Sequence, residues 1–184
     1  SFAERIDGAR VLGVRQGAPL RWPLGCRPDS LIGCTVGLAT RRGKYLWLPL
    51  LRDHGGSRAD PAGGLLLHLG MSGSLAFTAT GELAPAAKHD HFDLVTTRGG
   101  LRLTDPRRFG AVVWSPALDR LPAANLLARL GAEPFDPALT PEARARRPVP
   151  GTNGVGPFNT FADFSNYDRC ITRGLAGSWL PVVY

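Results

Sequence analysis

The chain reads Leu-Leu-Leu-His-Leu-Gly-Met-Ser-Gly at residues 65–73, Lys-His-Asp-His at 88–91 and Thr-Asp-Pro-Arg-Arg-Phe-Gly at 104–110. Four leucines around one His leave little room for a polar face, which predicts a buried strand over 65–69. Each of the three motifs places a side chain that can stack, wedge or bind phosphate beside a turn-forming residue. The stretch from 65 to 110 therefore indicates a surface that acts on nucleic acid, and the rest of the chain is organised around it.

Short segments with a strand pattern continue on both sides of this stretch. We expect further strands at 10–15, 31–40, 44–51, 74–78, 92–97, 101–104 and 111–114, with turns at 41–43, 98–100 and 105–110. Two segments are expected to be loops, namely 20–28 and the polar, Gly-rich 52–63, where His54 would be solvated. Short strands separated by turn signals are typical of an antiparallel sandwich or barrel.

Helical spacing is confined to the flanks of this strand-rich region. Residues 1–7 look like the last turns of a helix that Gly8 stops. A short helix is expected at 123–130, closed by Gly131, and another at 141–147. We therefore expect a mainly β domain with flanking helices, an antiparallel β-sandwich, over residues 1–147. Residues 148–184 show no sustained period and form an unassigned tail.

Arginine supplies almost all of the positive charge. The 184 residues contain 22 Lys and Arg against 15 Asp and Glu, a net charge of +7, and only Lys44 and Lys88 are lysines. The planar guanidinium suits phosphate and base edges, so a polyanionic partner fits this composition. A GC-rich genome, which favours Arg codons, accounts for the composition equally well.

The cysteines and the apolar runs bear on the compartment. Cys26, Cys34 and Cys170 lie far apart without a CxxC pair, which argues against a zinc site or a disulfide framework in this chain. No apolar run approaches the roughly 20 residues of a membrane span, and no signal peptide opens the chain. A soluble, cytoplasmic protein is expected.

Five motifs in one order carry a resemblance to a known family. They are Arg-Gly-Lys-Tyr-Leu (42–46), His-Leu-Gly-Met-Ser-Gly (68–73), Lys-His-Asp-His (88–91), Thr-Asp-Pro-Arg-Arg-Phe-Gly (104–110) and Leu-Gly-Ala-Glu-Pro (130–134). Together they resemble the N-terminal domain of the formamidopyrimidine-DNA glycosylase family, related to endonuclease VIII, over residues 8–147. The resemblance implies a β-sandwich flanked by helices. It also implies a second, helical domain with a helix-two-turn-helix element and a zinc finger, and DNA in the cleft between the two domains.

The resemblance also implies an activity and a partner. Members of this family act in base-excision repair: they remove oxidised purines such as formamidopyrimidine and 8-oxoguanine, then cleave the strand as abasic-site lyases. The implied partner is double-stranded DNA that contains oxidised bases or abasic sites. A monomer that associates with the nucleoid through DNA is expected.

An intercalating wedge is the first site that the resemblance implies. A base inside a duplex must be flipped out before it can be attacked, and the family's three-residue wedge maps here onto Met71, Arg107 and Phe109. Each residue has a simpler explanation. Met71 would fill a gap in the core, Phe109 would be a core aromatic at a strand start, and Arg107 with Arg108 would be a solvated pair. Asp105 is expected to orient one guanidinium by a charge-assisted hydrogen bond.

Phosphate contacts are the second implied site. Lys44, which otherwise decorates a hairpin turn, matches a cation that contacts the phosphate beside the lesion and assists β-elimination. His89 matches a phosphate-binding position, and His91 supports it. Among the residues of lower rank are Arg108 and His68. A His flanked by leucines is more often a core histidine with satisfied hydrogen bonds than a ligand.

The sequence departs from the family pattern in two places. The family begins with Pro-Glu-Leu-Pro-Glu-Val-Glu, whose proline forms the Schiff base and whose glutamate shuttles protons. This chain begins at Ser1, and Glu4 stands in the wrong place to replace that glutamate. The family's Gly-Val-Gly-Asn appears here as Gly-Val-Gly followed by Pro157, and its zinc cysteines do not appear, so no cofactor is expected in this chain. The expectation is a truncated copy with weak or no activity. The alternative is a non-catalytic module that recognises damaged or abasic DNA.

Overall fold

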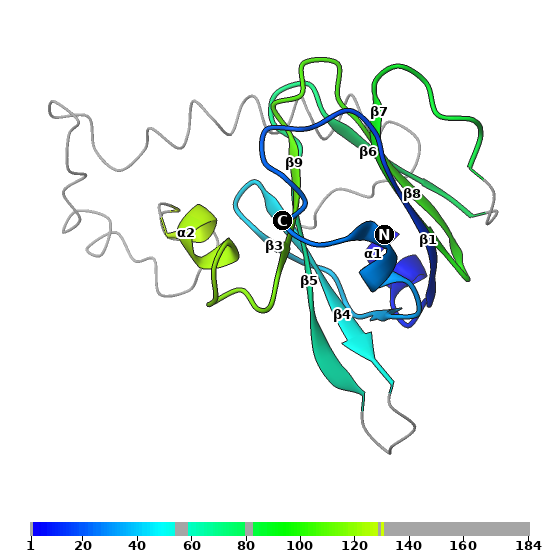
Figure 1. Cartoon of the computed structure of the whole chain (residues 1–184), viewed down its shortest axis with the longest axis vertical. Coiled ribbons are helices and arrows are strands. Elements are labelled where there is room, and N and C mark those ends of the chain that lie inside the picture. Colours follow the sequence, from blue (N-terminus) through cyan, green and yellow to red (C-terminus); the bar gives the residue numbers. More distant parts are fainter. Residues whose placement is uncertain (1, 54–58, 80–82, 129, 131–184) are drawn as a thin grey trace, which may run out of the picture.

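Two antiparallel sheets face each other in the computed structural model, which describes residues 2–53, 59–79, 83–128 and 130 (Figure 1). The five-stranded sheet has the order β2 (Thr35–Val36), β4 (Tyr45–Arg52), β5 (Asp60–His68), β9 (Ala111–Ser115), with β3 (Thr40–Arg42) also paired to β4. The four-stranded sheet has the order β1 (Val11–Gln16), β7 (Asp90–Thr96), β8 (Gly99–Thr104), β6 (Ser74–Thr78). The expected antiparallel β-sandwich is confirmed.

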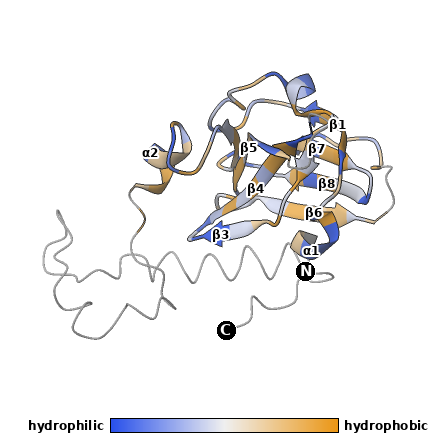
Figure 2. Cartoon of the chain, turned by 90° about the horizontal axis from the view of Figure 1, so that it is seen from below, coloured by the Kyte–Doolittle hydropathy of each residue, from blue (hydrophilic) through white to orange (hydrophobic). Residues whose placement is uncertain are grey.

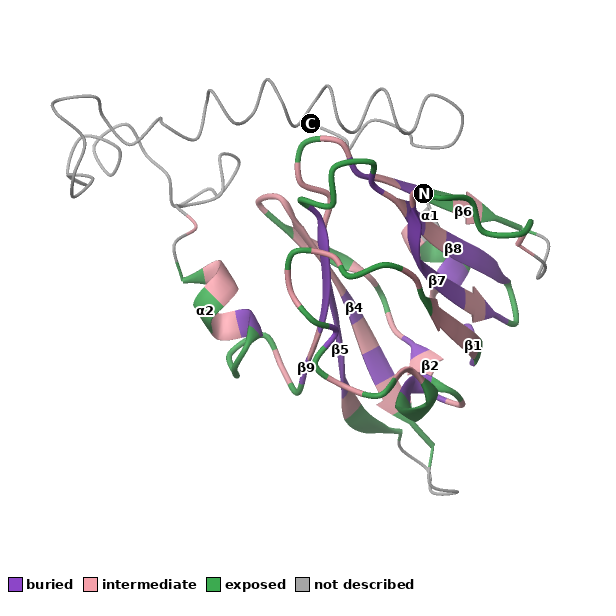
Figure 3. Cartoon of the chain, turned by 45° about the horizontal axis from the view of Figure 1, so that its top comes forward, coloured by how far each residue is buried: buried purple, intermediate pink, exposed green. Residues whose placement is uncertain are grey.

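The hydrophobic core lies between the two sheets. Alternate residues of each strand point inward, as the period of two requires. The five-stranded sheet contributes Leu48, Leu50, Leu65 and Leu67, and the four-stranded sheet contributes Phe92, Leu94, Leu101 and Leu103, all at most 2% exposed. Figure 2 shows these strands as largely apolar, and Figure 3 shows that burial is concentrated along β5, β7, β8 and β9.

The helices lie at the margins of the sandwich. α1 (Phe2–Ile6) and the 3₁₀ helix η1 (Pro28–Leu31) bury Ile6 and Leu31 in the core, and α2 (Ala123–Leu127) lies against β9. The helix expected over 1–7 is confirmed, and Gly8 follows it with φ +71°. The one expected over 123–130 ends earlier, because the Leu130 N–H bonds the Leu127 carbonyl three residues back (3.0 Å) and tightens the last turn.

The predicted hairpin over 31–51 is wrong in its first arm. The segment 31–40 is not one strand: Leu31 ends η1, Gly33 has φ +84°, and only the short β2 and β3 pair with β4. Pro28 starts the 3₁₀ turn that displaces the strand. The turn itself lies at Gly43-Lys44 rather than at 41–43, because Arg42 already pairs with Tyr45.

The loop predicted over 52–63 is also too long, since β5 begins at Asp60. Gly63, the last residue of the predicted loop, and the next residue, Gly64, lie inside β5, where they allow close packing. A Cβ on Gly64 would lie 2.4 Å from the Trp47 ring, and one on Gly63 would lie 2.8 Å from the Trp114 indole nitrogen. Glycine inside a strand here makes room for two large rings.

The remaining strands agree with the sequence to within one or two residues. The turn expected at 98–100 is shorter than predicted, because Thr96 already pairs with Gly99. Gly99 has φ +144°, and a Cβ there would lie 2.3 Å from the Thr78 carbonyl oxygen of β6. This glycine therefore belongs to the sheet, where only a residue without a side chain fits.

Several sequence predictions fall outside the described residues. These are the solvated His54, the helix at 141–147, Cys170 and the tail 148–184. In the described parts of the chain, no helix has the length and apolar character needed to cross a membrane.

Candidate nucleic-acid interface

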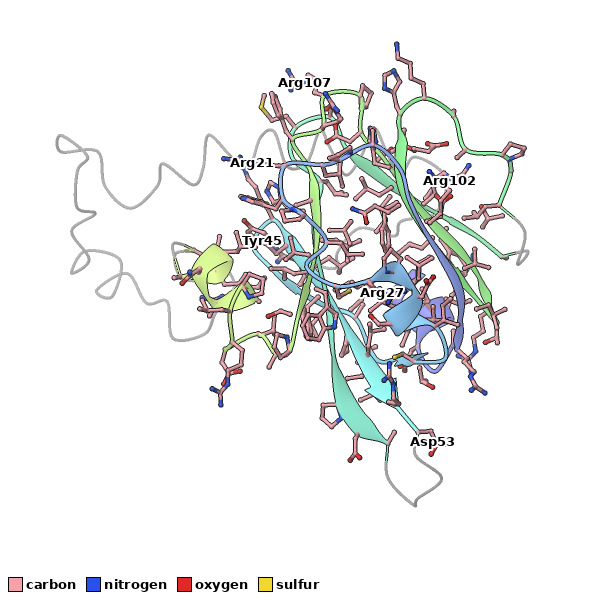
Figure 4. All side chains as sticks on the ribbon, in the orientation of Figure 1. Arg21, Arg27, Tyr45, Asp53, Arg102 and Arg107 are labelled. Atoms are coloured by element: carbon pink, nitrogen blue, oxygen red, sulfur yellow. The ribbon has the colours of Figure 1, made fainter. Side chains whose placement is uncertain are left out.

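The strand register brings the predicted site residues to one end of the sandwich. In the five-stranded sheet, Tyr45 pairs with His68, and His68 pairs with Ala111. The turn that contains Lys44, the turn after His68 and the loop before Ala111 therefore leave the sheet side by side. In Figure 4, Arg107 lies at the top and Tyr45 below it, while Asp53, just beyond the far end of β4, lies at the bottom.

The four-stranded sheet adds His89 to the same end. Thr104, the last residue of β8, pairs with Asp90 at the start of β7 and with Ser74 at the start of β6. His89 directly precedes β7, and its backbone carbonyl accepts a hydrogen bond from the Asp105 N–H (2.9 Å). His89 thus lies next to the loop 105–110, as a common site with Arg107 requires.

Two large apolar side chains stand exposed on adjoining loops. Met71 is 56% exposed and Phe109 is 45% exposed. A Cβ on Gly70, whose φ is +64°, would lie 2.8 Å from the carbonyl carbon of Phe109, so the two loops touch. Neither side chain belongs to the core, which removes the two simpler explanations for Met71 and Phe109. Exposed apolar groups held together on turns are suited to insertion between bases.

Asp105 joins the two loops. Its carboxylate is fully buried and accepts three hydrogen bonds, from the Ser72 hydroxyl (2.5 Å) and from the backbone N–H groups of Arg107 (3.2 Å) and Gly110 (2.7 Å). The sequence predicted a bond to a guanidinium instead. The partners differ because a tight turn leaves its own N–H groups pointing inward, where a short buried carboxylate reaches them first.

Arg107 and Arg108 are both exposed on the loop that Asp105 holds. The Arg107 guanidinium lies over the Phe109 ring, with its carbon 5.2 Å from the ring centroid. Arg108 has φ +57°, a left-handed conformation that is uncommon outside glycine and turns the chain back toward β9. The structure therefore places Arg107, rather than Arg108, with the exposed phenyl ring.

Lys44 and His68 lie on neighbouring strand ends. Lys44 occupies the β3–β4 turn and is partly exposed. The next residue, Tyr45, stacks against His68 with ring centroids 4.8 Å apart. The Nδ1 atom of His68 accepts a hydrogen bond from the Gly70 N–H (3.2 Å), so the neutral ring carries its proton on Nε2. His68 is thus half-buried at the edge of the site rather than a core residue.

Asp90 and His91 point into the protein. Burial disfavours the charged Asp90, but hydrogen bonds from Thr104 (2.5 Å) and the Ala87 N–H (2.8 Å), with the nearby Arg102 guanidinium, hold its pKa below the usual value. His91 is buried, and its Nε2 donates to the Asp105 carbonyl oxygen (3.0 Å). Among the described residues its Nδ1 has no partner. The hydrogen bond between Asp90 and Ala87 helps to fix the backbone around His89, and the one from His91 helps to fix the backbone at Asp105.

The structure adds Arg21 and its neighbour Trp22, which the sequence did not single out as site residues. Arg21 is exposed, and its backbone N–H donates to the Gly110 carbonyl (3.2 Å), directly after Phe109. Its guanidinium lies over the ring of Trp22, 4.8 Å from the centroid. Nothing in the local sequence signals this contact, because it forms across the fold. Arg21 appears between Arg107 and Tyr45 in Figure 4.

The chemistry of this end of the molecule is cationic and apolar. Arg21, Lys44, Arg107 and Arg108 lie at the same end of the sandwich as Met71 and Phe109. Within the described ranges, no cluster of three or more His, Cys, Asp or Glu side chains could hold a metal ion. An arrangement of cations around an apolar wedge can bind phosphates while it fills a gap between stacked bases.

Comparisons with known proteins agree with this geometry. Residues 1–112 match the model of the formamidopyrimidine-DNA glycosylase N-terminal domain. A formamidopyrimidine-DNA glycosylase of Albidiferax ferrireducens is 54% identical over 135 residues, which is 73% of this chain and 45% of the relative. A formamidopyrimidine-DNA glycosylase of Variovorax paradoxus is 51% identical over 142 residues, which is 77% of this chain and 48% of the relative. The chain thus spans about half the length of these curated relatives.

Two solved structures match part of the chain. The complex between the Lactococcus lactis Fpg and an abasic site containing DNA matches with a TM-score of 0.49 and 26% sequence identity. The match covers 62% of this chain and 39% of that one. A structure of MutM in complex with carbocyclic 8-oxo-G containing DNA matches with a TM-score of 0.49 and 27% identity, over 62% and 39% of the two chains.

Proposed function

This chain belongs to the formamidopyrimidine-DNA glycosylase family and carries that family's N-terminal domain, and from this premise we propose that it acts in base-excision DNA repair. Its proposed partner is double-stranded DNA that contains an oxidised base or an abasic site. The contribution of the described residues is to bind the duplex and open it at the damaged nucleotide. The observation that carries the proposal is the pair of exposed side chains, Met71 and Phe109, on two touching loops beside Arg107.

The wedge acts on the gap that a flipped nucleotide leaves. Extruding a base costs a few kcal/mol, part of which is recovered when apolar groups fill the vacated step. The thioether of Met71 and the ring of Phe109 are the apolar groups that the proposal assigns to this task. Arg107 lies over the Phe109 ring, from where a guanidinium could donate to the base that has lost its partner.

Cations around the wedge would hold the sugar-phosphate backbone. The proposal assigns phosphate contacts to Lys44 and His89, which stand at the same end of the sandwich as the wedge. Lys44 would also assist β-elimination, because an ammonium beside the phosphate stabilises the charge that develops on the leaving group. His68, His91 and Arg108 have supporting roles: the first lines the site, the second bonds the Asp105 carbonyl, and the third adds charge.

The substrate class of the proposal is oxidised purines. The curated relatives are named formamidopyrimidine-DNA glycosylases, which supports a formamidopyrimidine base as substrate. The resemblance extends this to 8-oxoguanine and to a second step, cleavage of the strand at the abasic site. The amine that attacks the sugar in this family is an N-terminal proline, followed by glutamate. We attribute the attack on the sugar to the whole family protein, and duplex opening, with assistance to β-elimination by Lys44, to the residues described above.

The wedge assignment predicts a preference for distorted DNA. The chain should bind a duplex with a tetrahydrofuran abasic-site analogue more tightly than the intact duplex, since no base then has to be unstacked. Replacing both Met71 and Phe109 with Ala should reduce this preference by roughly 5- to 100-fold, because stacking contributes about 1–3 kcal/mol per base. Fluorescence anisotropy with the two duplexes measures the ratio.

A matched control is Leu12→Ala, which removes a similarly exposed apolar side chain (54%). Leu12 lies near the start of β1, the end of that strand that is remote from His89. The Leu12→Ala variant should leave the ratio unchanged. If the double variant keeps the preference of the original chain, Met71 and Phe109 do not form a wedge.

Borohydride trapping on an 8-oxoguanine duplex distinguishes the glycosylase and lyase from the non-catalytic module. A covalent adduct supports the glycosylase and lyase, while binding without an adduct supports the non-catalytic module.

A further inference from the structure

The segment between β1 and η1 has a fixed place across the end of the sandwich. The Arg21 N–H donates to the Gly110 carbonyl (3.2 Å), and the Leu24 carbonyl accepts from the Trp114 N–H (2.7 Å). Both bonds lead to β9 or to the residue that precedes it. Arg21 is therefore held one residue away from Phe109, although the two are far apart in the sequence.

Trp22 holds the Arg21 side chain. The guanidinium carbon lies 4.8 Å from the centroid of the Trp22 ring. Trp22 itself is partly buried and lines a small cavity together with His91 and Phe92. A guanidinium over an indole keeps its charge and its N–H donors while its side chain loses freedom. Arg21 is thus an exposed cation whose position the protein has already set.

The charge of Arg21 is available to an outside partner. Across the described parts of the chain, no carboxylate forms an ion pair with its guanidinium. Burial raises the pKa of the Tyr45 phenol, and the Arg21 charge opposes that rise. Arg21 therefore lies within electrostatic reach of Tyr45, the neighbour of Lys44. Figure 4 shows Arg21 between Tyr45 and Arg107.

We propose that Arg21 binds a backbone phosphate of DNA beside the point where Met71 and Phe109 enter the duplex. This inference rests on the proposed function and extends its cationic surface to a third segment of the chain. A planar guanidinium can donate two parallel N–H bonds to phosphate oxygens. Phosphate contacts fix the position of a protein on DNA without reading its sequence. Arg21 would in this way set the depth and register of the wedge.

The salt dependence of binding tests the inference. The 184-residue chain and its Arg21→Gln variant are titrated with the tetrahydrofuran duplex at a series of salt concentrations. Loss of one phosphate contact should reduce the slope of log K against log salt by about 0.9. If the variant and the original chain have the same affinity when extrapolated to 1 M salt, the variant should bind roughly eight-fold more weakly at about 0.1 M salt. Arg21→Lys keeps the charge and should keep the slope.

Arg27→Gln is the matched control. Arg27 is also exposed, but it precedes η1, whose Ser30 carbonyl accepts from Arg52 at the end of β4 remote from Lys44. The slope of log K against log salt for the Arg27→Gln variant should equal that of the original chain. Thermal unfolding verifies that each variant folds, and Arg21→Ala serves as a second neutral variant. Equal slopes for the original chain and both neutral variants would overturn the role of Arg21 and leave the wedge intact. No preference of the original chain for the tetrahydrofuran duplex would overturn the proposed function, and this inference with it.

Discussion

At the scale of single residues, the geometry of the wedge depends on Asp105. Its buried carboxylate accepts from Ser72 in one loop and from the Arg107 and Gly110 backbone in the other. A buried acceptor with three donors cannot be removed without leaving those donors unsatisfied. Asp105 therefore positions Met71 and Phe109 without touching DNA itself.

Replacing Asp105 with Ala should lower both stability and the binding preference. We expect the free energy of unfolding to fall by about 2 kcal/mol, because buried N–H groups of the loop lose their acceptor. The preference for the tetrahydrofuran duplex should fall as well, since the loop that carries Phe109 is no longer fixed. Urea denaturation and anisotropy measure the two effects.

The exposed Asp119 offers a control for the loss of a carboxylate. Asp119→Ala should change the free energy of unfolding by less than about 0.5 kcal/mol and leave binding unaffected. A stable Asp105→Ala variant that keeps its preference would show that the loops hold their shape without the carboxylate.

The sequence motifs pointed to candidate site residues but not to how those residues are held. Met71, Phe109 and Arg107 are predicted from the resemblance of their motifs to those of the family, and each of these motifs is local in the sequence. The position of Arg21 and the hydrogen bond from Ser72 to Asp105 depend on contacts between distant segments. No local pattern records that the Arg21 N–H will meet the Gly110 carbonyl.

At the scale of the elements, β5 is the strand that positions the site. It pairs with β4 on one side and β9 on the other, so its end at His68 aligns the three loops of the interface. Gly64 lets β5 pass close to its neighbour, because a Cβ would lie 2.4 Å from the Trp47 ring and 2.6 Å from the Leu48 carbonyl oxygen.

Gly64→Ala should therefore destabilise the fold by about 1–3 kcal/mol, the usual cost of overpacking a rigid site. The contact is with backbone and an aromatic ring, neither of which can move far. Chemical denaturation of the variant and the original chain gives the difference.

Gly13 in β1 is the control for the same substitution. A Cβ there would meet only Val95, at an ordinary 3.9 Å. Gly13→Ala should be neutral or stabilise by up to about 1 kcal/mol, because it restricts the unfolded chain. Similar losses from both substitutions would contradict the role given to Gly64.

Strand periodicity predicted most elements, and the errors have one physical origin. The sequence treats Gly63 as a loop residue and leaves Gly64 outside the predicted strand, while the fold uses both inside β5, where tryptophan rings cross the sheet. In the same way, the pattern over 31–40 reads as one strand because alternation cannot register the 3₁₀ turn that begins at Pro28. Strand alternation registers neither feature, because it records only the period of the apolar residues within a local window.

At the scale of the whole molecule, a buried ion cluster joins three strands of the second sheet. Asp93 of β7 accepts hydrogen bonds from Arg15 of β1 (2.6 Å) and from Arg102 of β8 (2.8 and 2.9 Å). Burial opposes the charged form of Asp93, but the bonds from Arg102 and Arg15 hold its pKa below the usual 3.8. The cluster stabilises the folded state only while Asp93 is ionised.

The cluster predicts a pH-dependent effect of Asp93→Asn. Because the pKa of the folded state lies below that of the unfolded state, the stabilisation is present above pH 3.8 and is lost as the pH falls through the lower value. The variant should be less stable by about 2 kcal/mol at neutral pH, since Arg102 loses its main partner. The difference should shrink below pH 3.8.

Urea denaturation at several pH values measures this difference. Asp119→Asn, at an exposed position, should show no comparable gap at any pH. A gap for Asp93→Asn that stays constant into strong acid would mean that its charge is not what stabilises the sheet.

The pairing of His68 with Ala111 has a consequence for how the two wedge loops can vary in length. Each loop leaves a strand end that the sheet fixes, and each meets the other at Gly70 and Phe109. An insertion in one loop would shift one apolar tip while hydrogen bonds keep the other in place. Surface loops usually accept insertions freely. These two loops should accept insertions less readily than other surface loops, because a change in the length of one displaces it from the other.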